Sequence, residues 1–205
     1  MHGLRPSLLL LAAALLGLAP GTAPAQGVDS VSTPLVETTS PDTTVDPDVP
    51  FVRTPQRVVT RMLEIANVSA DDVVYDLGSG DGRIPITAAQ AYGARGVGIE
   101  IKPGLVQKAR QRAEMAGVAD RVAFRQQDLF EADFSDATVV TLYLLPDVNT
   151  RLRPLLFEQL APGTRVVSHG FDMDAWEADR VVQVGNTYLY LWTIPDEIPD
   201  ALRPE

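Results

Sequence analysis

A glycine-rich turn that follows a short apolar run is the feature that most restricts how this chain can fold. The stretch VVYDLGSGDGR, residues 73–83, indicates a buried strand that runs into Gly78, Gly80 and Gly82 and then into a helix. Glycine permits tight turns and lets backbone N–H groups come close to a ligand. In an open α/β sheet, the loop after the first strand is the usual ligand site. The sequence therefore predicts an α/β fold with a binding site at this loop.

Strand-like and helix-like segments alternate along the rest of the chain. The pattern implies a Rossmann-like, doubly wound and mostly parallel sheet with helices on both faces. Two strand-like halves around Gly185-Asn186, within 180–194, predict a C-terminal antiparallel hairpin. The other expected strands are 73–78, 95–100, 122–128, 137–143 and 164–170, and the expected helices after the first strand are 83–92, 103–117 and 148–160.

Two prolines add detail to the expected helices. A helix before the first strand is expected to have Thr54 as its N-cap and Pro55 at its first helical position. Pro154 lies inside the segment 148–160, where it removes a backbone donor and predicts a break or a new start.

The N-terminal 50 residues differ in character from the rest of the chain. Residues 1–25 hold one arginine, an apolar run shorter than the roughly 20 residues that span a bilayer, and small residues up to Ala25, which is the layout of a secretory signal peptide. Residues 26–50 indicate a disordered linker, and residues 51–205 the folded domain. We expect cleavage after Ala25 and a periplasmic or secreted protein with no stable membrane span. The alternative is an uncleaved segment that anchors the protein to a membrane.

Charge limits the class of partner. The chain has a formal net charge of −10 and contains no cysteine. An acidic protein repels a nucleic-acid backbone, so no nucleic-acid partner is expected. The absence of cysteine is compatible with export.

The spacing of the glycines separates two kinds of nucleotide site. A dinucleotide fingerprint G-x-G-x-x-G that starts at Gly78 needs a third glycine at position 83, where this chain has Arg83. The sequence has D-x-G-x-G-x-G from Asp76 to Gly82 instead. In this motif, and across residues 51–194, it resembles the class I S-adenosylmethionine-dependent methyltransferases. The resemblance implies a seven-stranded sheet that includes the C-terminal hairpin, and S-adenosyl-L-methionine as cofactor.

The resemblance also implies where the cofactor lies. Asp76 is expected to hold its amino end, and Glu100, at the end of the second strand in GVGIE, its ribose hydroxyls. Asp128, in QQDLF after the third strand, is expected beside the adenine. The full expected set is Asp76, Gly78, Ser79, Gly80, Gly82, Glu100, Asp128 and Leu129.

A narrower resemblance lies in FVRTPQRVVTRMLEIANV followed by VVYDLGSGDGRIPI. These residues are similar to the protein-lysine methyltransferases of the mitochondrial inner membrane that modify ATP synthase subunit c and the adenine nucleotide translocase. The chain departs from them in its exported-looking N-terminus and in TLYLLP after the fourth strand. The resemblance implies methylation of a protein lysine by in-line displacement at the sulfonium methyl group, with no metal. A small-molecule acceptor, or an exported inactive protein that keeps the fold and binds a ligand, remain as alternatives.

Three residues are candidates for the acceptor side of the reaction. Tyr143 ends the fourth strand, where it can contact an amine or simply pack in the core. His169 and Asp172 follow the fifth strand in VVSHGFDMDAW, where they can accept a proton, orient a cation, or serve only the fold. Arg83 is expected to pair with Asp76 or Asp81 rather than with substrate.

Overall fold

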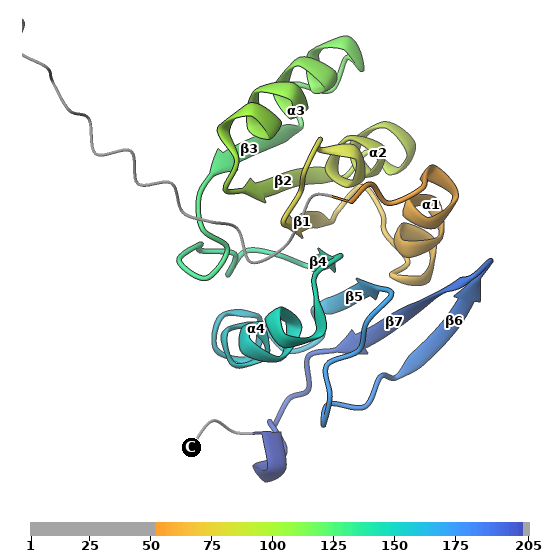
Figure 1. The fold of residues 1–205 in the computed structure, drawn as a ribbon, viewed down its shortest axis with the longest axis vertical. Coiled ribbons are helices and arrows are strands. Elements are labelled where there is room, and N and C mark those ends of the chain that lie inside the picture. The colour runs from red at the N-terminus through yellow and green to blue at the C-terminus, as the bar shows by residue number, and fades with distance from the viewer. Residues whose placement is uncertain (1–51, 203–205) are drawn as a thin grey trace, which may run out of the picture. The chain divides into compact units, whose positions relative to one another are not determined.

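The computed structural model describes residues 52–202 of the chain (Figure 1). The expected signal peptide, residues 1–25, and the expected linker, residues 26–50, lie outside the described residues. The expected domain, 51–205, is described except at its first and last few positions.

Seven strands form one sheet in the order β3-β2-β1-β4-β5-β7-β6. The first five run parallel, and β7 pairs antiparallel with both β5 and β6. This arrangement confirms the predicted doubly wound sheet with its C-terminal hairpin. The strands are β1 Val73–Leu77, β2 Arg95–Glu100, β3 Val122–Gln126, β4 Val139–Leu142, β5 Arg165–His169, β6 Arg180–Val184 and β7 Thr187–Thr193.

The helices cover both faces of the sheet, as Figure 1 shows. Helices α1 to α3 pack on one face, and α4 packs on the other. Alternation along β1 supplies both cores, because Tyr75 and Leu77 face the α4 side whereas Val74 faces α1 and α2. The helices are α1 Gln56–Ile65, α2 Arg83–Tyr92, α3 Pro103–Met115 and α4 Pro146–Gln159, and a short 3-10 helix spans Asp200–Leu202.

The strand order reverses at β1, which lies between β2 and β4. The loop from Gly78 to Gly82 starts at the carboxyl end of β1, so it lies at the point where an open parallel sheet binds ligands. The carboxyl ends of β2, β3, β4 and β5 reach the same edge, because these strands are parallel to β1.

The predicted N-cap of α1 and the predicted break at Pro154 were wrong. Thr54 does not cap α1: the N-cap is Pro55, which has no side chain able to cap, and the Thr54 side chain is buried elsewhere. Helix α4 runs through Pro154 without the expected break and begins earlier than expected, with Pro146 in its first turn. Leu152 and Leu156, before and after the proline, are both fully buried in the same core, and this packing offsets the loss of one backbone hydrogen bond.

Candidate active site

Three of the five residues in the glycine loop adopt the left-handed backbone conformation. Gly78, Gly80 and Gly82 have φ angles of 81°, 53° and 76°, a region in which residues with a Cβ are strained. At Gly82 a Cβ would lie 2.5 Å from the Phe124 ring, so the loop also depends on close packing against β3. All three positions therefore require glycine for conformation, and Gly82 also requires it for space.

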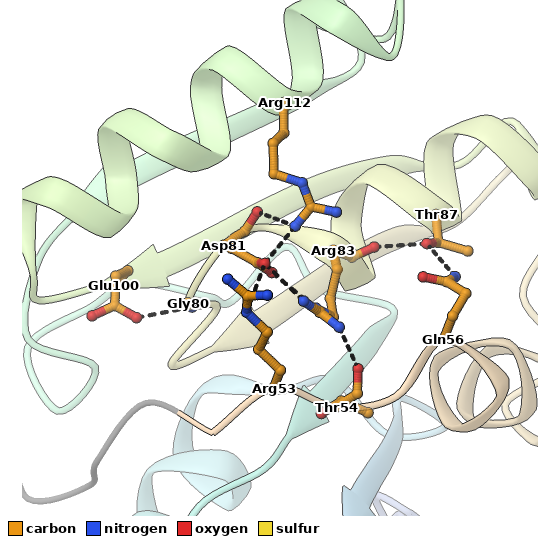
Figure 2. A network of polar contacts seen from close by, with 9 residues as sticks. All are labelled: Arg53, Thr54, Gln56, Gly80, Asp81, Arg83, Thr87, Glu100 and Arg112. Carbon is orange, nitrogen blue, oxygen red and sulfur yellow. Dashed lines mark hydrogen bonds and ion pairs between the residues drawn. The ribbon is translucent and has the colours of Figure 1, made fainter.

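The N–H groups of the loop hold it to the neighbouring strand β2. Gly78 and Ser79 both donate to the Ile99 carbonyl, at 2.9 Å each. Gly80 donates to Oε2 of Glu100 at 2.8 Å, as Figure 2 shows, and Oε1 of Glu100 accepts the N–H of Lys102 at 2.9 Å. Gly78 and Gly80 thus direct their N–H groups to β2, and Gly82 donates to the Ser79 carbonyl at 2.9 Å. The predicted contact of these glycines with a ligand stays a prediction. A carboxylate accepts about four hydrogen bonds, so Glu100 keeps capacity for two hydroxyls.

Asp76 is a buried acid at the end of β1, with 4% of its surface exposed. Its Oδ1 accepts the hydroxyl of Thr141, its neighbour in register on β4, at 2.8 Å. Burial raises the pKa of Asp76 to about 7, an effect that Thr141 opposes and that the negative charges of Glu100 and Asp81 reinforce. A cation placed beside this carboxyl would favour its ionised form.

Three arginines pair with the Asp81 carboxylate. Arg83 donates two hydrogen bonds to its carboxylate, at 2.9 and 2.7 Å, Arg112 of α3 lies 2.7 Å away, and Arg53 lies 3.8 Å away (Figure 2). Burial would raise the pKa of Asp81, but Arg83 and the other two arginines hold it below its usual value. The expected partner of Arg83 is thereby identified as Asp81. The same guanidinium donates to the Thr54 carbonyl at 2.6 Å.

The residues around the loop fit a sulfonium nucleoside. Among the described residues, the Ser79 hydroxyl is buried without a hydrogen-bond partner, so a polar group remains to be satisfied beside the loop. The arginine cluster neutralises Asp81, whereas Asp76 keeps a raised pKa, which a cation placed beside it would lower. Asp128 lies after β3, where its Oδ1 accepts the N–H of Phe130 at 2.9 Å, and Leu129 is partly buried against the α4 core.

Two of the three acceptor-side candidates come together. The rings of Tyr143 and His169, at the ends of β4 and β5, lie 3.9 Å apart between centroids. His169 is 4% exposed, and burial lowers its pKa to about 4, so its ring is neutral at pH 7. The Asp172 side chain lies in an exposed turn, where its Oδ1 accepts the N–H of Asp174. Among the described residues, no hydrogen bond or ion pair joins Asp172 to Tyr143 or His169.

Sequence reasoning missed several residues that complete the site. Thr141 had a local signal, since it is a polar residue in the otherwise apolar strand VVTL. Arg112 had none, because it reaches the loop from α3. Thr54 was predicted from the sequence only as a helix entry or a cover over the cofactor, and its contact with Arg83 was not foreseen. Two further findings apply only to residues 52–202: no cluster of three metal-ligating side chains occurs there, and none of the helices has the length and apolar character needed to cross a membrane.

The chain is similar to known methyltransferases in sequence and in overall structure. The model of the ANTKMT methyltransferase domain matches residues 76–180. A protein-lysine N-methyltransferase of Saccharolobus islandicus (strain REY15A) is 49% identical over 152 residues, which cover 71% of this chain and 94% of that protein. The adenine nucleotide translocase lysine N-methyltransferase of Mus musculus is 34% identical over 146 residues, 71% of this chain and 63% of that protein. The crystal structure of an RNA methyltransferase from Salinibacter ruber with S-adenosyl-L-homocysteine is 66% identical with a TM-score of 0.73, and the match covers 75% of this chain and 100% of that one.

Proposed function

The chain belongs to the ANTKMT methyltransferase family, and from that premise we propose that it methylates a lysine side chain of another protein. It is a methyltransferase that uses S-adenosyl-L-methionine, as the resemblance of its sequence implied. The observation that carries the proposed acceptor is the 49% identity to a protein-lysine N-methyltransferase over 94% of that protein's length. The chain spans 63% of the mouse relative's length, so we do not propose that relative's acceptor for this chain.

RNA is the second candidate acceptor, because the Salinibacter ruber structure is described as an RNA methyltransferase at 66% identity. The net charge of −10 disfavours it, since an RNA-binding surface needs a basic groove to track the phosphates. An acidic protein instead attracts a lysine-bearing, cationic segment. We therefore place the protein lysine first and make RNA an outcome of the test.

For the cofactor, we propose that Asp76 pairs with its amino group and Glu100 with its ribose hydroxyls. Glu100 already fixes Gly80, so one carboxylate shapes the loop and faces the nucleoside. The predicted neighbours Gly78, Ser79, Gly82, Asp128 and Leu129 lie around the carboxyl ends of β1 and β3, in keeping with this placement. S-adenosyl-L-methionine supplies a methyl group that its positive sulfur has already activated.

The chain's contribution to transfer is alignment and exclusion of water. An amine attacks only when neutral, so the lysine must lose a proton on entering the site. His169 has a pKa of about 4, which makes it a weak base. We propose that the proton leaves to bulk water as the amine enters, before water is excluded from the site. Tyr143 then lines the amine's path, with His169 holding its ring, and the exposed Asp172 attracts the cationic acceptor segment.

Labelled methyl transfer tests the acceptor class. Purified protein and S-adenosyl-L-methionine with a labelled methyl group are incubated with cell-envelope lysate, and digests are searched for methyl-lysine by mass spectrometry. A matched sample has its lysines blocked by acetylation, and another is treated with nuclease. We expect the label to appear in protein. Acetylation of the lysines should abolish this labelling, and nuclease treatment should leave it unchanged. Label lost on nuclease treatment would identify RNA, and label only in the low-molecular-weight filtrate would identify a small molecule. Cofactor binding without any transfer would favour the inactive alternative.

We also propose export, based on residues 1–25. N-terminal sequencing of the natural protein is expected to start at Gln26. Recovery of intact Met1 from the membrane fraction would support the uncleaved anchor, and its recovery from cytoplasm would contradict both. An exported enzyme would also need S-adenosyl-L-methionine outside the cytoplasm, so the same fractions are assayed for it.

A further inference from the structure

Thr54 contacts both halves of the site. Its backbone carbonyl accepts the Arg83 guanidinium at 2.6 Å, and Arg83 is itself held by two hydrogen bonds to Asp81 in the glycine loop (Figure 2). Its Oγ1 lies 3.4 Å from Nδ1 of His169, at the end of β5. One residue before α1 therefore joins the cofactor loop to His169, whose ring lies against Tyr143.

The position of Thr54 is not explained by helix formation. Threonine is a favoured N-cap residue, and the sequence places Thr54 where a cap for α1 is expected. The structure gives this role to Pro55, which makes no side-chain cap. Thr54 is instead 4% exposed, with its hydroxyl directed to His169. The chain forgoes a cap and uses the hydroxyl inside the site.

The contact has a chemical consequence for His169. A neutral imidazole carries its proton on one nitrogen and accepts on the other, and the hydrogen bond at one nitrogen selects the tautomer. When the Thr54 hydroxyl donates to Nδ1, the proton of the ring resides on Nε2. The same bond restricts ring rotation, which matters because the Tyr143 ring lies against this imidazole.

We propose that Thr54 is a positioning residue that couples the cofactor loop to the acceptor side of the site. In this proposal, a displacement of Asp81 when the cofactor binds shifts Arg83, and Arg83 in turn shifts the Thr54 carbonyl that it bonds. The Thr54 hydroxyl passes this shift to His169, and thereby to Tyr143. This inference rests on the proposed function, since Tyr143 and His169 are placed there beside the acceptor.

Two substitutions separate the hydroxyl from the packing of Thr54. Thr54→Val keeps the branched shape in a buried position and removes the hydroxyl, and Thr54→Ser restores the hydroxyl. Thr60→Val is the matched control, because among residues 52–202 the Thr60 hydroxyl bonds only to the Gln56 carbonyl on α1. For Thr54→Val we expect kcat for methyl transfer to fall about tenfold or more, with the calorimetric Kd for S-adenosyl-L-homocysteine within about twofold of the unaltered protein. Thr54→Ser should recover most of the loss, and Thr60→Val should lose none.

A second measurement does not need activity. The ring nitrogens of His169 are followed by 15N nuclear magnetic resonance during titration with S-adenosyl-L-homocysteine. In the unaltered protein the shifts should report one tautomer and should move on ligand addition, whereas in Thr54→Val they should report a mixture that the ligand leaves unmoved. Equal kcat in Thr54→Val and the unaltered protein, or ligand-dependent His169 shifts that survive Thr54→Val, would overturn the inference. If the unaltered protein binds the ligand but methylates no acceptor, the proposed function fails, and the titration alone decides the coupling.

Discussion

Replacing the buried carboxyl group of Asp76 should change folding stability and cofactor affinity in opposite directions. Asparagine has nearly the same shape, keeps an oxygen for the Thr141 hydroxyl and carries no charge. The substitution Asp76→Asn therefore removes a charge that is costly to bury, and that the cofactor is proposed to need.

The magnitude follows from the raised pKa. Below about pH 4 the carboxyl group is protonated in both the folded and the unfolded protein, so it contributes nothing to the pH dependence. Between its ordinary value of 3.8 and its folded value of about 7, the unfolded state ionises first, and stability falls as pH rises. The loss levels off above pH 7 at about 4 kcal/mol, from about 1.4 kcal/mol per pKa unit. Asp76→Asn should therefore be more stable than the unaltered protein by up to about 4 kcal/mol at pH 8, which is about 10 °C in Tm.

Urea unfolding at pH 4 and at pH 8, without cofactor, measures this difference. We expect the two proteins to converge at pH 4 and to separate at pH 8. Calorimetry with S-adenosyl-L-methionine should show the opposite order, with affinity at pH 8 about tenfold to a hundredfold weaker in Asp76→Asn, because a charge-assisted hydrogen bond is lost. Affinity of the unaltered protein should rise through pH 7, and the variant, titrated with the same ligand, corrects for the ligand's own ionisation. Equal stability at pH 8 would refute the argument that this carboxyl group is buried at a cost.

Three further substitutions test the loop and its anchors. Glu100→Ala should weaken binding of S-adenosyl-L-homocysteine by roughly 1.5 to 3 kcal/mol in calorimetry, and unchanged affinity would place the ribose elsewhere. Gly82→Ala should lower the free energy of unfolding in urea by about 2 kcal/mol or more, because the residue has a φ of 76° and its Cβ would clash with Phe124. Adding Phe124→Leu to the same chain should recover part of this loss of stability. Asp81→Asn should cost about 2 to 3 kcal/mol at pH 7, discounted for the partial exposure of its arginines. Since the pKa of Asp81 is lowered, this contribution is present above pH 3.8 and is lost as pH falls further, so the variant should unfold less steeply in acid.

Local sequence patterns determined the helices and strands and the position of the glycine loop. Helix α2 and strand β2 have the boundaries predicted for them, 83–92 and 95–100, because glycine and apolar periodicity act over a few residues. The position of Glu100 at the end of the second strand was predicted for the same reason, and the last residue of a parallel strand lies at the ligand edge of the sheet. The role of Glu100 toward the ribose was implied by the family resemblance and stays a prediction. The glycine spacing from 78 to 82 separated this loop from a dinucleotide fingerprint.

Only the tertiary structure decided how the charged and polar groups are paired. The raised pKa of Asp76 depends on its burial inside the folded sheet, on Glu100 at the end of β2, and on Asp81 in the loop after β1. The contact between Thr54 and His169 joins residues 115 positions apart, and the local signal at Thr54 pointed to a helix cap. Desolvation and pairing of charges depend on which side chains meet in space, and a one-dimensional pattern carries that information only where the partners are close neighbours in sequence.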